Sequence, residues 1–338
     1  MPAAKNILVT GGAGFIGGWF IRHMLQVHGD RYTLICFDKL DYCASTSNFT
    51  SIKRHHNFYF VKGDICNTLD VEEALRTYNI DAIVHFAAQS HVDKSLIDPI
   101  SFSRTNVLGT QVLLETARRF NTIKRFIHVS TDEVYGENDD QDPVAFAENQ
   151  GLCPTNPYSA SKAAAEMIVQ AYRKSFQMPL IIARCNNVFG PHQYPEKLIP
   201  KFITLLNQGK KMPIQGNGRN SRAFLWAGDA AEAFDVIFHK GSDGETYNIS
   251  SEDRLQVLRV AQKILEYFDL CSAPRLEDWI EPVADRPFND SMYWTDDSKL
   301  RALGWRQRTE FDDGLRQTVE WYCLHSDGFW SEAESNGV

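Results

Sequence analysis

The chain has 338 residues, a length that suits one large α/β unit or two closely joined domains. Its composition, 43% hydrophobic and 23% charged, is that of an ordinary globular protein, and its net charge of −8 argues against nucleic acid or an anionic membrane as a partner. We expect a cytoplasmic protein with reduced thiols, because no secretory leader, no apolar run of membrane-spanning length and no C-x-x-C pair is evident.

Short apolar runs in the first half predict β-strands, and helix-like stretches separate them. The predicted strands are Asn6–Thr10, Thr33–Asp38, Phe58–Lys62, Ala82–Phe86, Phe126–Ser130 and Leu180–Arg184. The predicted helices are about Phe15–His28, Leu69–Tyr78, Phe102–Phe120 and Tyr158–Phe176. This alternation implies parallel pairing, and strands that are apolar on both faces indicate a sheet covered by helices on both sides. We therefore predict a doubly wound parallel α/β sheet.

The pattern changes after about Asn186, where Gly, Pro and Asn become frequent. Helical stretches recur near Leu198–Gln208 and Ala227–Phe238, and Thr246–Ile249 is strand-like. We expect a dinucleotide-binding domain over 1–186, with a return segment near 223–250. Residues 187–330 would form mainly a smaller, substrate-binding C-terminal lobe.

A glycine motif follows the first predicted strand. Gly11, Gly14 and Gly17 form a G-x-x-G-x-x-G turn that also contains Phe15 and Ile16. The first glycine permits the tight turn, the second lets a pyrophosphate approach the backbone, and the third lets helix and strand pack closely. The helix N-terminus presents free N–H groups and its positive dipole end to the phosphates. The motif predicts a Rossmann-type dinucleotide site.

Acidic residues near the ends of the next two strands indicate which dinucleotide binds. Asp38 ends the second strand, where its carboxylate would accept the ribose hydroxyls of adenosine and repel a 2′-phosphate. NAD is therefore predicted rather than NADP, although Lys39 follows directly. Asp64 and Ile65 follow the third strand, and Asp64 would either hold adenine or cap a helix.

A tyrosine and a lysine stand four residues apart in a predicted helix. Tyr158 and Lys162 would share one helix face, and the ammonium together with a positive nicotinamide would favour the phenolate. Tyr158 could then take a proton from a sugar hydroxyl while hydride leaves the carbon. Ser130-Thr131, at the end of the fifth strand, offers a hydroxyl to the same substrate oxygen.

These motifs, in this order, resemble those of the extended short-chain dehydrogenase/reductase family. The resemblance also rests on His85-Phe86-Ala87-Ala88 and Asn187-Val188-Phe189-Gly190-Pro191, and it extends to about Trp321. It implies that Tyr158 is the base, that Lys162 binds the nicotinamide ribose and that Thr131 orients the substrate. It further implies that Ala87 and Ala88 border the cofactor and that Asn106 lies near it.

Two adjacent carboxylates, Asp132 and Glu133, follow Thr131. They could be the first turn of a helix, where acidic residues are favourable, but Gly136 argues against a long helix. They could instead divide acid and base roles in one pocket. Once C4 of a glucose is a ketone, a base can remove the C5 proton while an acid protonates the departing C6 hydroxyl. The hydride returned to C6 would then regenerate the cofactor.

Thr-Asp-Glu at this position resembles the nucleotide-diphosphoglucose 4,6-dehydratases of that family. The resemblance implies that Asp132 is the acid and Glu133 the base in the conversion of dTDP- or UDP-glucose to the 4-keto-6-deoxyglucose nucleotide. It also implies sugar or diphosphate contacts from Ser90, Asn187, Lys197, Arg222 and Arg286. Phe288-Asn289 departs from the Gly-His usual in bacterial dTDP-glucose enzymes, and the run 38–43 looks like that of UDP-glucose-using rhamnose synthases. The base of the nucleotide stays open between dTDP and UDP.

Three rival activities would use the same fold. A 4-epimerase needs Tyr158 and Lys162 but no carboxylate pair after Thr131. A UDP-glucuronate decarboxylase keeps a glutamate near this position but acts on a carboxylate substrate. A non-catalytic dinucleotide sensor would be expected to lack the tyrosine or the lysine, and this chain has both.

We expect no metal ion at the site and a homodimeric protein. His85, His91 and His128 lie near strand ends at spacings that suggest no shared coordination. The family resemblance implies a dimer paired through the helices Phe102–Phe120 and Tyr158–Phe176. Both helices have apolar residues beyond those that one buried face needs, namely Val112, Leu113, Leu114, Met167, Ile168 and Val169.

Overall fold

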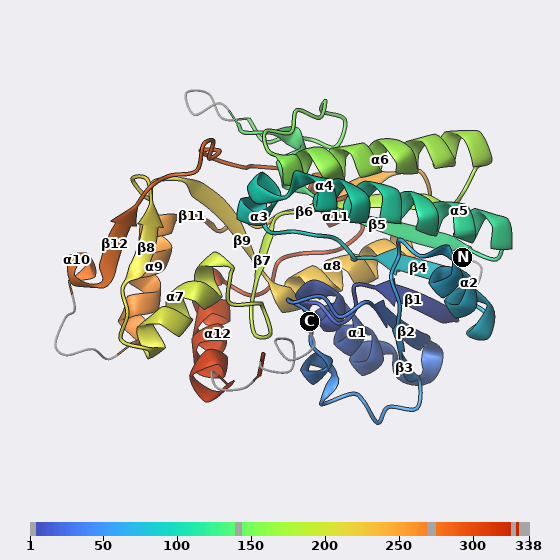
Figure 1. Ribbon diagram of the computed structural model, residues 1–338, viewed down its shortest axis with the longest axis horizontal. Helices are drawn as coiled ribbons and strands as arrows, with labels where there is room; N and C mark the ends of the chain where they lie inside the picture. The colour runs from blue at the N-terminus through green and yellow to red at the C-terminus, as the bar shows by residue number, and fades with distance from the viewer. Residues whose placement is uncertain (1–4, 139–143, 269–274, 326–328, 331–338) are drawn as a thin grey trace.

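Seven parallel strands form the central sheet of the protein, in the order β10-β6-β5-β4-β1-β2-β3 (Figure 1). They are β1 (Asn6–Thr10), β2 (Thr33–Asp38), β3 (Phe58–Lys62), β4 (Ala82–His85), β5 (Arg125–Thr131), β6 (Leu180–Cys185) and β10 (Thr246–Ile249). The computed structural model describes residues 5–138, 144–268, 275–325 and 329–330, and the remaining parts of both predicted domains lie outside the described residues. The predicted Rossmann-type doubly wound class is confirmed.

Helices cover both faces of this sheet, because successive strand residues are apolar on alternate sides. Ile7 and Val9 pack in one core with residues of α1 (Phe15–His28) and α8 (Ala227–Lys240). Leu8, between them, packs in a second core on the opposite face. That face carries α2 (Thr68–Thr77), α5 (Thr110–Phe120) and α6 (Pro157–Phe176), and Figure 1 shows α5 and α6 on the side away from α1. The strand order reverses between β1 and β4, which is where doubly wound sheets open a ligand crevice.

A smaller lobe lies beyond the end of the sheet (Figure 1). Its three-stranded sheet consists of β7 (Asn187–Phe189), β9 (Ser221–Trp226) and β11 (Arg254–Gln256), and a parallel pair consists of β8 (Met212–Gln215) and β12 (Ile280–Val283). Its helices are α7 (Leu198–Asn207), α9 (Val257–Tyr267), α10 (Leu276–Trp279) and α12 (Phe311–His325). They enclose a separate apolar core. Between β9 and β11 the chain returns to the large lobe through α8 and β10, and α11 (Ser298–Ala302) packs beside β10.

The predicted helix over 102–120 is divided into several pieces. After α3 (Val92–Ile97) the chain forms α4 (Pro99–Phe102), a wider π-helical turn η3 (Ser103–Gly109) and then α5. Apolar spacing continues through the segment, so the sequence pattern does not distinguish these pieces. Shorter turns are η1 (Gly29–Arg31) and η2 (Thr46–Phe49). Among the described helices, none combines the length and the apolar character required to cross a membrane.

Candidate active site

The glycine turn brings the backbone of β1 against the loop after β4. Gly11 has a φ of +68°, and a Cβ on it would lie 2.5 Å from the backbone nitrogen of Ala87. A Cβ on Gly17 would lie 2.5 Å from the carbonyl oxygen of Gly11. Gly14 caps α1 without any side-chain hydrogen bond to the helix N-terminus. Gly11 and Gly17 therefore let these backbone segments pack closely, and the N-terminus of α1, which no side chain caps, lines the cavity and fits a pyrophosphate.

Asp38 is held at the edge of this space by main-chain donors. The N–H of Ala13 donates to Asp38 Oδ2 over 3.0 Å and the N–H of Leu40 to Oδ1 over 2.8 Å. Burial raises the pKa of Asp38 to about 6, although both hydrogen bonds lower it. Lys39 turns to Asp41, with 2.9 Å between Nζ and Oδ2. Each oxygen of Asp38 keeps a lone pair that could accept a ribose hydroxyl.

Asp64 and Ile65 line the same cavity. The cap of α2 is Asn67, whose side chain accepts from the N–H of Leu69 over 3.0 Å. Asp64 therefore does not have the helix-capping role that the sequence left open. Its Oδ1 accepts from the N–H of Cys66 over 2.9 Å, which fixes the turn that follows β3.

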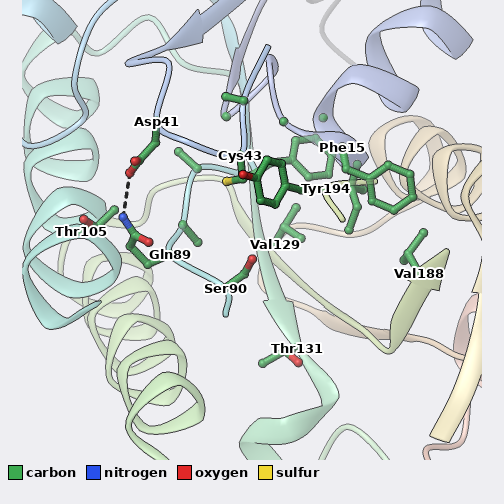
Figure 2. A pocket seen from close by; sticks show the side chains of 18 of the residues that line it. Phe15, Asp41, Cys43, Gln89, Ser90, Thr105, Val129, Thr131, Val188 and Tyr194 are labelled. Carbon is green, nitrogen blue, oxygen red and sulfur yellow. Dashed lines mark hydrogen bonds between the residues drawn. The ribbon is translucent and has the colours of Figure 1, made fainter. Parts of the chain in front are cut away.

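Asn106 supports the cavity from behind its wall. Its amide accepts from the N–H of Gln89 over 2.8 Å and donates to the Gln89 carbonyl over 3.0 Å. Gln89 then donates to Asp41 over 2.8 Å, the bond that is dashed in Figure 2. Ala87 and Ala88 line the cavity, whereas Asn106 is not among its lining residues. Asn106 thus lies one layer behind the cavity wall, where it holds the loop that contains Gln89 in place.

The tyrosine and lysine come from the first turns of α6. Asn156 caps this helix by accepting from the N–H of Ser159 over 2.9 Å, and Pro157 occupies the first helical position. Lys162 Nζ donates to the carbonyl of Val129 over 2.7 Å, and burial lowers its pKa to about 8. Tyr158 and Lys162 both line the cavity with Thr131.

The protein by itself raises the pKa of Tyr158, whereas the sequence argument combined Lys162 with a bound nicotinamide. Burial raises this pKa, the charges of Glu133 and Asp132 raise it further, and a hydrogen bond with Thr131 lowers it. The ammonium of Lys162 donates to the Val129 carbonyl. Without a cofactor the neutral phenol of Tyr158 is therefore favoured.

Asp132 and Glu133 open a short turn, η4 (Asp132–Tyr135), that ends at Gly136 with a φ of +83°. This conformation excludes the long helix that the sequence left as an alternative. Asp132 Oδ1 accepts from the Thr131 hydroxyl over 3.2 Å, and Glu133 Oε2 accepts from the amide of Asn156 over 3.2 Å. Asp132 lines the first cavity only, whereas Glu133 also lines the neighbouring one.

The two carboxyls differ in their electrostatic surroundings. Burial and the adjacent Glu133 raise the pKa of Asp132 to about 7. Burial also raises the pKa of Glu133, but the Asn156 hydrogen bond and the positive charges of Arg222 and Lys197 oppose the rise. Arg222 and a hydrogen bond with Thr131 also lower the pKa of Asp132, so in both carboxyls burial prevails over surroundings that favour the charged form.

A buried polar network holds the carboxylate turn against the sheet. Arg184 on β6 pairs with Glu166 on α6 over 2.6 Å, and both side chains are almost wholly buried. Arg184 Nη1 also donates to the hydroxyl of Tyr135 over 2.6 Å, and this hydroxyl donates to Asn248 over 2.8 Å. Tyr135 ends η4, so the network fixes the turn that carries both carboxylates.

A second cavity adjoins the first on the side of the small lobe. Ser90, Glu133, Asn187, Glu196 and Lys197 line both, so the two cavities form one cleft. Figure 2 shows Ser90 and Thr131 in this region, with the ring of Tyr194 farther up the wall. Lys197 Nζ donates to the carbonyl of Ser90 over 2.6 Å, which joins the two lobes.

The two expected phosphate-binding arginines already have protein partners. The two terminal nitrogens of Arg222 donate to the carbonyls of Ser221, Ser291 and Asp290 and to the side chain of Asn289, over 2.8–3.3 Å. Arg286 forms a forked pair with Asp93, with N···O distances of 2.6 and 3.2 Å. Both arginines line the second cavity. Arg222 therefore fixes the 289–291 loop as well as supplying positive charge.

Sequence reasoning missed several residues that line the cleft. Asp290 is buried, and its Oδ2 accepts from Tyr293 and, over 2.8 Å, from Thr155. Its Oδ1 has no hydrogen-bond partner within the described residues, nor do the buried Ser130 Oγ and Asn186 Oδ1 of the first cavity. Such orphan atoms fit polar ligands. Asp290 directly follows the Phe288-Asn289 pair noted in the sequence, but a loop carboxylate has no local pattern that reveals its surroundings.

A dinucleotide-binding fold with a tyrosine, a lysine and two adjacent carboxylates in one cleft defines the chain as an extended short-chain dehydrogenase/reductase. Residues 8–318 match the family described as GDP-mannose 4,6 dehydratase, and the chain belongs to this family. This bears out the predicted resemblance.

The individual relatives that the chain resembles are nucleotide-sugar 4,6-dehydratases. The chain is 48% identical over 328 residues to a trifunctional UDP-glucose 4,6-dehydratase/UDP-4-keto-6-deoxy-D-glucose 3,5-epimerase/UDP-4-keto-L-rhamnose-reductase of Arabidopsis thaliana, covering 97% of this chain and 48% of that protein. It therefore spans about half the length of this relative. It is 44% identical to the dTDP-D-glucose 4,6-dehydratase of Bos taurus, covering 98% and 92% of the two chains. The dTDP-glucose 4,6-dehydratase DesIV of Streptomyces venezuelae, solved with NAD bound, is 37% identical and has a TM-score of 0.91, with coverage of 97% and 100%.

Proposed function

We propose that this chain is an NAD-dependent hydro-lyase that converts dTDP- or UDP-glucose to the 4-keto-6-deoxyglucose nucleotide and water. The observation that carries the proposal is the pair Asp132–Glu133, which directly follows Thr131 and enters the cleft beside Tyr158. A 4-epimerase requires no such pair. The relatives named above support a dehydratase, and those with dTDP-glucose and UDP-glucose in their names leave both nucleotides as candidates.

Bound NAD would accept the C4 hydride and return it to C6, so no second redox substrate is consumed. Gly11, Gly14 and Gly17 would hold the pyrophosphate, Asp38 the adenosine ribose, and Lys162 the nicotinamide ribose. Tyr158 would accept the proton of the C4 hydroxyl, with Thr131 orienting that oxygen. The positive charge of the oxidised nicotinamide would oppose the rise in the pKa of Tyr158 that burial causes.

The carboxylates would then carry out the elimination. Glu133 would remove the C5 proton, while Asp132 would protonate the C6 hydroxyl as it leaves as water. After hydride reaches C6, Glu133 would return a proton to C5, and transfer of the proton from Tyr158 to Asp132 would reset both groups. The different positions of the two carboxyls support this assignment, because Asp132 lies beside the Thr131 hydroxyl in the first cavity whereas Glu133 lines both cavities.

We also propose a cytoplasmic homodimer that pairs through η3, α5 and α6. The interface predicted from sequence requires correction, because Leu113, Leu114 and Val169 are buried in the core of their own chain. Exposed apolar side chains of η3 and α6 include Leu108, Met167 and Phe176, with exposures of 48%, 49% and 48%. Sedimentation should show a dimer at micromolar concentration, and Met167→Glu should shift it towards monomer. A wild-type chain that sediments as a monomer would contradict this proposal.

The decisive experiment separates oxidation at C4 from elimination. Purified protein is incubated with dTDP-glucose and with UDP-glucose in D₂O, and the product mass, the NADH absorbance and the deuterium at C5 are followed. Wild type should release product lighter by one water. Glu133→Gln should accumulate NADH and 4-keto sugar without exchange at C5, whereas Asp132→Asn should exchange C5 but lose water slowly. Wild-type rates from both variants would contradict the proposed roles.

A further inference from the structure

Three histidines surround one carboxylate between α1 and α8, on the outside of the large sheet. His23 and His28 come from α1, and Asp235 and His239 come from α8. His23 Nε2 lies 2.9 Å from Asp235 Oδ2, and His28 Nε2 lies 2.9 Å from the same oxygen. His239 Nδ1 lies 2.6 Å from Asp235 Oδ1. Four residues on two packed helices thus direct their polar atoms to one point.

The cluster has no part in the proposed reaction. His28 is the last of the 14 residues of α1, so it lies about 20 Å along the helix from the glycine turn. The sequence analysis considered only His85, His91 and His128, none of which belongs to a potential metal-binding group within the described residues. His23 and His28 are five residues apart on one helix, and no local motif links them to the second helix.

The geometry of the cluster is that of a metal centre. The ligating atoms of His28, Asp235 and His239 all lie within 4.8 Å of one another. Zinc binds imidazole nitrogen and carboxylate oxygen at about 2.0–2.2 Å with tetrahedral geometry, which places neighbouring ligand atoms about 3.3 Å apart. The observed N···O distances of 2.6–2.9 Å need only a small outward movement to accept an ion. His23 lies outside this group, but its Nε2 contacts Asp235 Oδ2, so a rotation of its imidazole would supply a fourth ligand.

The surroundings of the cluster also suit an ion. Tyr32 lies with its hydroxyl 2.6 Å from His239 Nε2, so it can orient the imidazole whose Nδ1 would bind metal. The side chains of the four ligands are 12–20% exposed, which leaves an entry route from solvent.

We propose that His23, His28, Asp235 and His239 bind one divalent transition-metal ion of the zinc class. Neutral imidazoles with one carboxylate suit Zn²⁺, Co²⁺ or Ni²⁺ rather than Mg²⁺ or Ca²⁺. The ion takes the place of the protons that the imidazoles share with Asp235, so binding releases protons and weakens as the pH falls. Because it joins the first helix of the fold to the returning helix α8, the ion stabilises the folded large lobe and leaves the cleft unchanged.

The test uses the NAD-loaded protein, stripped with chelator and titrated with ZnCl₂ by calorimetry at pH 7.5. We expect one site per chain, and cobalt should give the intense visible absorption of a four-coordinate ion. At a free zinc concentration 100 times the Kd, the ratio of folded to unfolded protein should rise about 100-fold. His28→Gln and His239→Gln should each abolish the site while NAD content and dehydratase turnover stay at wild-type values.

A matched control separates this site from an exposed one. Asp30, His55 and His56 form the other potential ligand group within the described residues, and the His56–Asp30 pair is about 70% exposed on each side. His56→Gln should leave the stoichiometry and the cobalt spectrum unchanged. The proposal is overturned if wild type binds no zinc below millimolar concentration, or if binding persists in His28→Gln and is lost in His56→Gln. Circular dichroism and NAD content verify that each variant is folded. If His28→Gln does not fold, His23→Gln is used in its place.

Discussion

The two halves of the cleft are built in different ways. In the dinucleotide half the decisive groups are main-chain atoms of one continuous strand–turn–helix unit, and Gly11 and Gly17 matter because they lack a Cβ. In the substrate half they are side chains from separate segments, such as Ser90, Arg222 and Arg286. These side chains also hold one another in place, as Arg222 holds the 289–291 loop.

This difference determines which substitutions each half of the cleft tolerates. A Cβ added at Gly11 or Gly17 meets backbone atoms, which cannot move without distorting the packing of β1 against its neighbours. On the substrate side, a single substitution removes one contact and leaves the others in place. The catalytic residues lie between the halves, where one substitution should stop chemistry and leave binding of both ligands intact.

The largest effect should come from Tyr158→Phe. Loss of the phenol removes the base for C4 oxidation, and general acid–base groups contribute about 10²–10⁴-fold in rate. Turnover should fall by that factor, while NAD content and nucleotide binding stay unchanged because the ring remains in its packed position. Stopped-flow measurement of NADH formation tests this. Unchanged turnover would place the base elsewhere in the cleft.

A smaller effect, on stability, is expected from Asp132→Asn. The folded protein raises the pKa of Asp132 to about 7 from a usual value near 4, so it binds more protons than the unfolded chain between these values. Stability from this group is therefore present at acid pH and is lost as pH rises towards 7. At pH 8 the amide should stabilise the fold by on the order of 2–4 kcal/mol, with little difference at pH 4. Urea unfolding of both proteins at pH 4 and pH 8, without substrate, measures this difference in the free energy of unfolding. Equal stabilisation at both pH values would refute the explanation by the Asp132 pKa.

Gly17→Ala tests the backbone half directly. The new Cβ would meet the Gly11 carbonyl at 2.5 Å, so the turn must shift. We expect the NAD content of purified protein to fall about tenfold and the free energy of unfolding to fall by about 1–3 kcal/mol. Gly151→Ala is the matched control, because a Cβ there meets no atom within 4 Å. If Gly17→Ala retains full NAD, close approach at the turn is not required.

The smallest effect is expected from Asp290→Asn in the substrate half. The amide keeps the shape of the side chain but weakens Oδ1 as an acceptor for a donor of the nucleotide sugar. The KM for that substrate should rise about tenfold, which corresponds to about 1.4 kcal/mol, with kcat changing less and NAD content unchanged. Asp278→Asn, on exposed α10, is the control. An unchanged KM would mean that Asp290 only supports the loop through Thr155 and Tyr293.

Much of the dinucleotide half could be predicted from the sequence. The first three strands begin and end where the apolar runs do, and every expected cofactor residue except Asn106 lines the first cavity. This is possible because each signal is local: the glycines, Asp38 and the Tyr158–Lys162 spacing act within one strand, turn or helix. The sequence does not show that Asn106 lies behind the wall of this cavity, because a π-helical turn and a contact with Gln89 decide where its amide points.

By itself the sequence determined the parallel sheet, the glycine turn and the acidic end of β2, since short-range spacing specifies them, and it named the residues that we propose as catalytic. Only the tertiary structure decided the direction of the Tyr158 pKa shift, the pairing of Arg286 with Asp93 and the unpartnered oxygen of Asp290. The packing of α1 against α8 also brings His23 and His28 into contact with Asp235, next to His239. Burial and contacts between segments more than 100 residues apart depend on how whole layers pack, and no local pattern encodes them.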